Sequence, residues 1–298
     1  MTRRGLLLFA VMCVIWGIPY LLIRVAVGEI SPAMLVFART GIGALILMPI
    51  VLARGGVRAI RGKWIPVLAF AAAEIGMPWI FLSTAEQHIS SSLAALLISS
   101  VPLVGMAVAP LFGNRERMGP AAVGGLAVGL VGVAAIVGLD LHASGVTALV
   151  QMAVVVVGYA LGPAILSRYL KGVPSVSVTG ISLTACAVVY APLAAAHWPR
   201  LMPSAGVLVS VGVLAVVCTA VAFLLFFALI EEIGPVRSTV ITYINPAVAA
   251  LAGVTILHET FTVGMGIGFV LVLAGSFLAT RRTARTSGTG KGASARSP

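Results

Sequence analysis

Long apolar segments dominate the sequence and predict membrane-spanning helices. Ten such segments follow one another with short connections, and none alternates apolar and polar residues as a half-exposed strand does. A helix that crosses a bilayer needs about 20 mostly apolar residues. The pattern therefore predicts an all-α integral membrane protein with ten transmembrane helices. The segments lie at approximately 5–27, 32–53, 64–83, 91–112, 120–139, 145–167, 175–197, 204–230, 236–257 and 262–280.

The order of polar and helix-breaking residues indicates that the second half of the chain repeats the first. Pro102 and Pro246 each fall near the middle of a segment, and a glutamate follows each apolar run, at Glu116 and Glu259. Five helices in each half is an odd number, so the second half enters the membrane from the opposite side. Inverted repeats of this kind are widespread among secondary transporters, which bind substrate near the bilayer midplane between the repeats. The predicted repeats are residues 1–140 and 141–281.

The mid-span prolines and the two glutamates have simple structural interpretations. Proline cannot donate to the carbonyl four residues earlier, so Pro102 and Pro246 predict helix kinks and release carbonyls that need other partners. Each kink either bends during gating or gives the cavity a fixed shape. Glu116 and Glu259 come just before the next helix, and we expect them to cap a helix N-terminus rather than take part in transport.

The composition agrees with a lipid environment and explains the net charge. The chain is 60% hydrophobic and 9% charged, whereas a soluble domain carries roughly 25% charged residues. Its net charge of +11 does not indicate nucleic-acid binding, because nearly all Lys and Arg fall in alternate connections. This bias predicts that both termini face the cytoplasm of a bacterial-type cell, across its inner membrane.

The chain ends and the cysteines change this picture little. The first segment follows two arginines as a signal peptide does, but the run is long and no Ala-x-Ala site follows, so we expect a retained helix. The three cysteines lie inside predicted spans with no disulfide or metal spacing, which favours a packing role. Residues 282–298 are basic and rich in Ser and Gly, and predict a disordered cytoplasmic tail.

Four stretches together resemble a known family: "WGIPYLLIRVA" (Trp16–Ala26), "SPAMLVFARTGIGAL" (Ser31–Leu45), "SSLAALLISSVPLVGMAVAPLFGNRERM" (Ser91–Met118) and Ala228–Gly275, which contains "INPAVAALAGVTILHE". They are similar to the EamA family of the drug/metabolite transporter superfamily, over almost the whole chain. The resemblance implies a ten-helix carrier with a central cavity that exports amino acids or other small metabolites. The chain departs from the usual pattern late in the third span, where Glu86 and its neighbours stand in place of an aromatic residue.

Two charged residues inside predicted spans are the first candidates for the cavity. Glu74 lies ~15 Å into the third span; a carboxyl at that depth is costly and usually faces a partner or a water-filled cavity. It either binds a substrate amine, carries a proton for coupling, or hydrogen-bonds a neighbouring helix. Arg39 lies ~10 Å into the second span and could bind a substrate carboxylate bidentately. Alternatively, Arg39 and Glu74 pair with each other.

Aromatic and amide side chains at mid-membrane depth complete the candidate site. Aromatic rings there are not explained by the interfacial belt; they either stack on a substrate or pack helices. Hydroxyls and amides could orient a substrate in an apolar pocket or hold helices together. Asn245 is favoured because its counterpart in the first half is the apolar Val101. These candidates are Trp16, Tyr20, Trp79, Tyr159, Tyr243 and Asn245.

The sequence thus predicts a secondary membrane transporter that exports small metabolites by alternating access. The expected partners are a small-molecule substrate and the lipid bilayer; a proton or a counter-substrate remains open, and no nucleic acid, cofactor or metal is expected. An intramembrane enzyme is one rival, but all four histidines lie at span ends or in connections, and neither HExxH nor GxSxG occurs. A non-transporting scaffold or receptor is the other.

Overall fold

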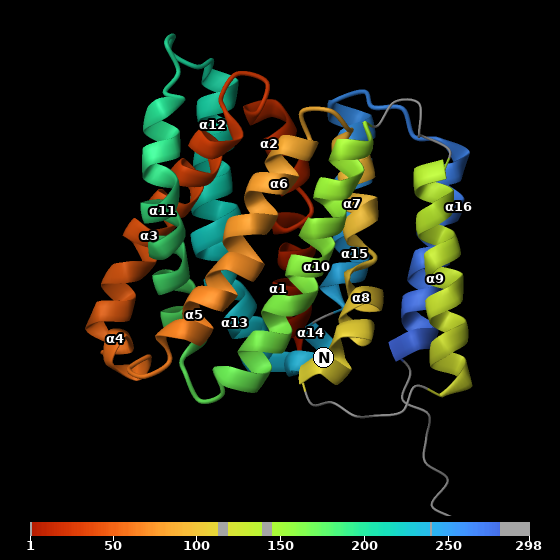
Figure 1. Cartoon of the computed structure of the whole chain (residues 1–298), viewed down its shortest axis with the longest axis horizontal. Coiled ribbons are helices and arrows are strands. Elements are labelled where there is room, and N and C mark those ends of the chain that lie inside the picture. The colour runs from red at the N-terminus through yellow and green to blue at the C-terminus, as the bar shows by residue number, and fades with distance from the viewer. Residues whose placement is uncertain (1, 113–118, 139–144, 239, 281–298) are drawn as a thin grey trace, which may run out of the picture.

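The computed structural model describes residues 2–112, 119–138, 145–238 and 240–280 and forms an upright helical bundle (Figure 1). The described residues contain no strand. The α-helices of the first half are α1 (Arg3–Ile15), α2 (Pro19–Ala26), α3 (Pro32–Ala53), α4 (Gly56–Ala59), α5 (Trp64–Phe70), α6 (Met77–Ala85), α7 (Ser91–Ile98), α8 (Val101–Val108) and α9 (Pro120–Gly138). Those of the second half are α10 (Val146–Tyr169), α11 (Ser175–Ala196), α12 (Ala205–Ala215), α13 (Ala222–Ile233), α14 (Pro235–Ser238), α15 (Ile241–Ile256) and α16 (Val263–Thr280). Two π-helices, η1 (Ala71–Gly76) and η3 (Val216–Val221), and the 3-10 helix η2 (Ala109–Phe112) link some of them.

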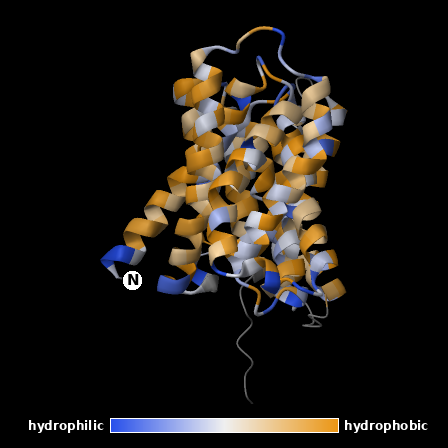
Figure 2. Cartoon of the chain, turned by 90° about the vertical axis from the view of Figure 1, so that its left-hand side faces the viewer, coloured by the Kyte–Doolittle hydropathy of each residue, from blue (hydrophilic) through white to orange (hydrophobic). Residues whose placement is uncertain are grey.

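The bundle has the length and polarity of a membrane domain. In the described part, eight helical stretches are long and apolar enough to cross a bilayer, and α15 and α16 are shorter apolar helices. Hydrophobic residues dominate the middle of the bundle, and hydrophilic residues gather at its ends (Figure 2). We call the end that holds the start of α1, α4 and α14 the Arg4 end. The opposite end, where α7, α12 and α16 begin, is the Glu259 end (Figure 1).

Two of the predicted spans are broken rather than continuous. The first divides into α1 and α2 at residues 16–18, because Pro19 opens a new helix. The fourth divides at Ser99 and Ser100, so the expected kink at Pro102 is a break, with the proline in the first turn of α8. Pro246, by contrast, lies inside a helix that remains continuous.

The largest helix contacts join the first half to the second. α3 packs on α11 and η3, α10 packs on α6 and η1, and α15 packs on α7. One set of contacts is symmetric between the halves: α3 packs on η3 of the second half, and α11 packs on η1 of the first half. This interlocking places the buried core between the halves.

Glycines allow α9 and α16 to approach closely at one edge of the bundle (Figure 1). A Cβ placed on Gly125 would lie 2.7 Å from the Gly275 carbonyl oxygen and 2.5 Å from the Ala279 nitrogen. These are backbone atoms that cannot swing aside. About two helical turns further along α9, Gly132 makes the same kind of contact with Gly268. Small residues at a close helix crossing are typical of membrane proteins.

We expect Gly125→Ala to lower the melting temperature of the purified protein in detergent. The added methyl would push α9 and α16 apart, and overpacking of this kind costs roughly 1–3 kcal/mol. Gly124→Ala is the matched control, since a Cβ there meets nothing within 4 Å. Equal melting temperatures for the two variants would contradict the close crossing.

Candidate functional site

A π-helix places Glu74 inside the third span. The widened turn of η1 releases backbone carbonyls from the regular ladder, and π-helical turns are frequent at functional sites. Two side chains of α11 meet these carbonyls: Tyr190 Oη donates to Gly76 O at 3.1 Å, and Cys186 Sγ lies 3.6 Å from Ala71 O. The irregular backbone is thereby satisfied inside the protein, as an apolar environment demands.

The second π-helix, η3, lies at the corresponding place in the other half and presents Thr219. Glu74 and Thr219 are each the fourth residue of their π-helix. The Thr219 hydroxyl donates to Leu214 O at 2.8 Å and so satisfies a carbonyl within its own widened turn. The same oxygen accepts a hydrogen bond from Arg39, described next.

Arg39 is a buried cation that bridges the two halves. Its side chain is 7% exposed. Nε donates to Thr219 Oγ1 at 2.8 Å, and Cζ lies 3.6 Å from the centroid of the Trp79 ring. A guanidinium stacked on an aromatic face in a desolvated place is held by a cation–π interaction of about 2 kcal/mol. Within the described residues, its two Nη groups make no hydrogen bond and no ion pair.

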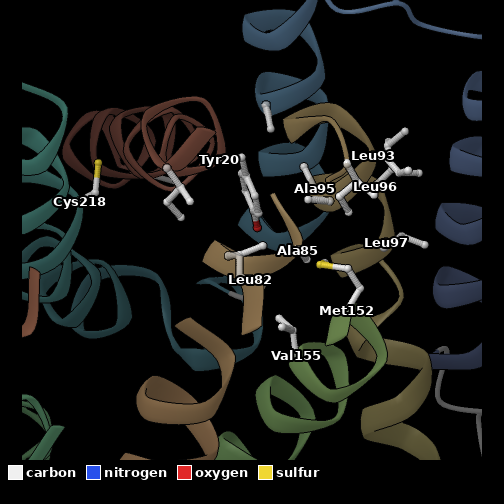
Figure 3. Close-up of a cluster of buried hydrophobic side chains, with 14 of the residues drawn as sticks. Tyr20, Leu82, Ala85, Leu93, Ala95, Leu96, Leu97, Met152, Val155 and Cys218 are labelled. Atoms are coloured by element: carbon white, nitrogen blue, oxygen red, sulfur yellow. The ribbon is translucent and has the colours of Figure 1, made fainter. Parts of the chain in front are cut away.

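Two tyrosines lie in the electrostatic neighbourhood of Arg39. Tyr20 of α2 is buried, and Tyr159 of α10 lies half-buried beside Trp79. Both tyrosines interact electrostatically with Arg39, and they interact electrostatically with each other. Figure 3 shows the Tyr20 ring extending from α2 toward α6, with its hydroxyl on the side of Leu82 and Ala85. Four predicted candidates therefore lie together, on α2, α3, α6 and α10.

Glu74 borders this group but does not pair with Arg39. Its carboxyl lies against Gly162 of α10, where any Cβ would overlap it, and Oε2 is buried without a hydrogen-bond partner. Tyr159 is the member of the group whose electrostatics it affects. Among the described residues, the ion pair at 3.8 Å joins Arg4 and Glu232 at the bundle end, not Arg39 and Glu74.

Glu86 joins the site although the sequence analysis did not select it. It follows the last residue of α6, where charged residues are normally solvated, yet it is 0% exposed. Neither carboxylate oxygen has a hydrogen-bond partner in the described structure. Burial raises the pKa of the Glu86 carboxyl well above its usual range and Glu259 adds to the rise, while Arg24 and Arg39 oppose it. The helical end position favoured exposure, and the departure from the family pattern at Glu86 was the signal in the sequence that could have selected it.

Trp16, just after the end of α1, packs against aromatic residues of α13. Its ring packs on Phe226, with centroids 4.7 Å apart, and edge-on to Phe223 at 6.0 Å, both on α13. Trp16 comes just after the end of α1 at Ile15, whereas Tyr20 lies in α2. The contacts of Trp16 are those of helix packing.

Asn245 donates a hydrogen bond to a backbone carbonyl that the break in the first span leaves free. At the end of α1, the Gly17 N–H bonds to Val14 O and leaves Cys13 O without its usual helical donor. In the amide orientation that matches donors to acceptors, Asn245 Nδ2 donates to Cys13 O at 3.1 Å and to Ile241 O at 3.0 Å. Both amide hydrogens are thus used by backbone carbonyls. Tyr243, two residues earlier on α15, is half-buried.

A carboxylate from each half caps a helix of the other half at the Glu259 end. Glu259 accepts from Ser91 N at 2.8 Å, Ser92 N at 2.9 Å and Ser92 Oγ at 2.6 Å, at the start of α7. Glu29 accepts from the backbone nitrogen of Ser204 at 2.7 Å and from its hydroxyl at 2.6 Å, at the start of α12. These ties hold the halves together at this end.

The capping role expected for Glu259 is present, but on a different helix. The sequence suggested the helix that follows it, α16, whose first turn is capped by Thr262 instead. Sequence proximity misled here, because the cap is formed across the halves. Glu116 and the predicted tail at 282–298 lie outside the described residues.

A cavity of about 380 Å³ opens beside these ties, lined by Arg24, His88, Ser90, Leu257 and Glu259 among others. Arg24 also donates to the backbone carbonyl of Glu86. Arg24 therefore links the cavity wall directly to Glu86. In the described part of the chain, no group of three or more His, Cys, Asp or Glu is placed to hold a metal ion.

The described geometry is that of a multi-pass membrane protein with a buried polar site between two similar halves. Residues 3–138 and 146–281 each match the EamA-like transporter family. The chain therefore belongs to that family and contains two of its repeats, which confirms the resemblance. The repeat boundaries at 140 and 141 stay predictions.

The relatives of the chain carry transporter names. It is 27% identical to "Uncharacterized inner membrane transporter YedA" of Escherichia coli strain K12, with 89% of each chain covered. It is 25% identical to "Uncharacterized transporter YvbV" of Bacillus subtilis, over 91% of this chain and 90% of the relative. A solved structure titled "Crystal structure of protein" shares the fold at a TM-score of 0.66 and 23% identity, covering 94% of this chain and 97% of that one. The names point to a transporter rather than an enzyme.

We expect Thr219→Val to destabilise the protein because the substitution keeps the side-chain shape and removes the partner of Arg39 Nε. A hydrogen bond to a charged group is worth about 1.5–3 kcal/mol. Thr84→Val is the control, because Thr84 bonds only to the carbonyl of Ile80 in its own helix. Thermal unfolding in detergent measures both, and a double-mutant cycle with Arg39→Met isolates the pair. A coupling energy near zero would show that the pair contributes nothing.

The Glu259 cap should make stability depend on pH. Partial burial acts to raise the pKa of Glu259, but the hydrogen bonds from Ser92 and Ser91 outweigh it, and the pKa lies below its ordinary value. A carboxyl with a lowered folded-state pKa stabilises the fold above its unfolded pKa of about 4.3 and loses that contribution as pH falls through the folded value. Glu259→Gln should therefore melt earlier than the parent at neutral pH, and the difference should close in acid. The exposed Glu231→Gln should show no such difference at either pH.

Proposed function

We propose that the protein is a secondary carrier for small metabolites, working by alternating access across the inner membrane. α15 and α16 supply the ninth and tenth spans, which completes two inverted five-helix repeats. Lys and Arg gather at the Arg4 end, on the connections of α4 and α14 and before α1, which favours a cytoplasmic location for that end and for both termini. The inner-membrane name of the Escherichia coli relative supports the same membrane.

The main support for this proposal is that Arg39 is buried with hydrogen-bond donors left unused among the described residues. A buried guanidinium is costly unless its donors are used, and here one face is held by Thr219 and Trp79 while the Nη groups have no partner among the described residues. An anionic oxygen of a substrate would complete the set, and a guanidinium binds a carboxylate with two parallel hydrogen bonds. Tyr20 and Tyr159 border the same space and would orient the bound molecule.

Glu74 supplies a second buried polar group, which acts on Tyr159 electrostatically. It would be the neutral acid without substrate and would ionise when a cationic amine binds beside it. A substrate that carries both an acidic and an amino group, such as an amino acid or a related compound, would match Arg39 and Glu74 at once. The separation of these two residues supports such a substrate better than the alternative in which they neutralise each other. Tyr243, on the same helix as Asn245, would border the path from the second half.

Alternating access requires ties that open at one end while those at the other hold. At the Glu259 end these are the two carboxylate caps described above. At the Arg4 end, Glu232 accepts from Thr2 Oγ1 at 2.5 Å, and Lys63 Nζ donates to Lys171 O at 3.0 Å. Each tie joins one half to the other. With both sets made, the Arg39 group is closed off from either side.

Substrate flux in liposomes tests the proposal. Metabolomics of medium and cytosol, with and without the protein, would first select candidates, and counterflow of each candidate would follow with the purified chain. We expect Arg39→Gln to lower counterflow at least about tenfold, since losing one charge-assisted contact costs more than about 1.4 kcal/mol. Glu74→Gln should change the pH dependence of the flux if that carboxyl carries a proton.

Arg58→Gln is the matched control. The substitution removes the same charge as Arg39→Gln, but Arg58 is exposed at the Arg4 end. It should transport like the parent. Counterflow that is absent for every member of a broad metabolite panel would argue against a carrier. Flux that survives Arg39→Gln would support a carrier but would show that Arg39 does not bind the substrate.

A further inference from the structure

Glu86 lies where the cavity at the Glu259 end approaches the Arg39 group. Arg24, which lines the cavity, donates to the Glu86 backbone carbonyl, and Glu259 on the same cavity wall acts on the Glu86 carboxyl electrostatically. From the other side, Tyr20 and Arg39 feel the charge of Glu86. The charge of one carboxyl therefore couples to residues of the cavity wall and to the buried group.

The side chain of Glu86 has no partner that would hold it ionised. Both oxygens are buried without a hydrogen bond in the described structure, and the residue is 0% exposed. Arg24 uses its guanidinium on the backbone carbonyl rather than on the carboxyl.

The charged and titratable groups that interact electrostatically with Glu86 lie on several elements. They are Arg24 and Tyr20 on α2, Arg39 on α3, Tyr159 on α10, and Glu259 after α15. Two cations thus act against the negative charge of Glu259 and against burial. An ionised carboxylate taken from water without hydrogen bonds costs far more than a neutral carboxylic acid does. With the ties at the Glu259 end made, the neutral acid is the stable form.

We propose that Glu86 is a proton-binding site, which holds a proton while the Glu259 end is closed and exchanges it with water through the cavity lined by Arg24, His88 and Glu259. The proton adds to the carboxylate when the end closes and leaves to water when it opens, so no other bond changes. This inference rests on the proposed carrier function and names the coupling ion. Glu86 suits the task better than Glu74, whose carboxyl lies deeper, against Gly162.

Infrared spectroscopy of the full-length protein tests the proposal without a substrate. In a detergent free of ester groups and at neutral pH, the protein should show the C=O stretch of a protonated carboxylic acid. Glu86→Gln should remove part of that band. The rest should vanish in the Glu74→Gln/Glu86→Gln double variant. Transfer to D2O should shift the Glu86 part of the band to lower frequency, because its proton exchanges with water.

The exposed Glu231→Gln is the matched control and should leave the band unchanged, since carboxyls in water are ionised at neutral pH. If Glu86→Gln does not fold, Glu86→Asp should keep a band at a changed frequency. A band that Glu86→Gln does not alter would overturn the proton site. A Glu86 band that does not shift in D2O would overturn its exchange through the cavity. Neither result depends on flux, so failure of the carrier assay is a separate outcome.

Discussion

Backbone carbonyls released by irregular helices must find donors inside the protein, and much of the structure follows from that requirement. Water is absent from the middle of a bilayer, and each unsatisfied group costs several kcal/mol. Cys13 O at the end of α1 is met by Asn245, and Gly76 O in η1 is met by Tyr190. In both cases the donor comes from the other half. These two irregular places are thus contacts between the halves, whereas the break at Ser99 and Ser100 is satisfied by the hydroxyls of those two serines.

The buried site is built from the same breaks. Widening of the eighth span into η3 places Thr219 where it can accept from Arg39 while it donates to its own backbone. Widening of the third span sets Glu74 against α10. A regular helix in either place would present different side chains to the centre. The departures from helical geometry therefore determine which residues face the interior.

The spans were predictable because hydropathy is a local property, whereas the partners of single side chains are not. All ten apolar segments contain helices. Depth in the membrane selected Arg39, Tyr20, Trp79 and Tyr159, but it selected Trp16, Tyr243 and Asn245 equally and could not show which of these residues lie together. The bond of Asn245 to α1 depends on a contact between distant parts of the chain. Its amide was favoured as a substrate contact because it lacks a counterpart in the first half.

Two residues escaped the sequence analysis for different reasons. Glu86 sits one position beyond its helix, and only the folded structure shows that it is buried. Thr219 is a common type of residue in a membrane helix, and nothing in its neighbourhood signals a π turn. The cap formed by Glu259 could not be assigned either, because its target lies in the opposite half.

The matching π turns bear on how a duplicated carrier comes to distinguish the two ends of its substrate. Two identical subunits related by a twofold axis must place the same side chain at both equivalent positions, which suits a symmetric cargo. Fusion of the halves into one polypeptide removes that obligation. Here one position holds a carboxyl, Glu74, and the other a hydroxyl, Thr219, that holds a cation. Both halves hold a π turn, but the side chains at its fourth position differ in chemistry, as the asymmetric substrate proposed above would require.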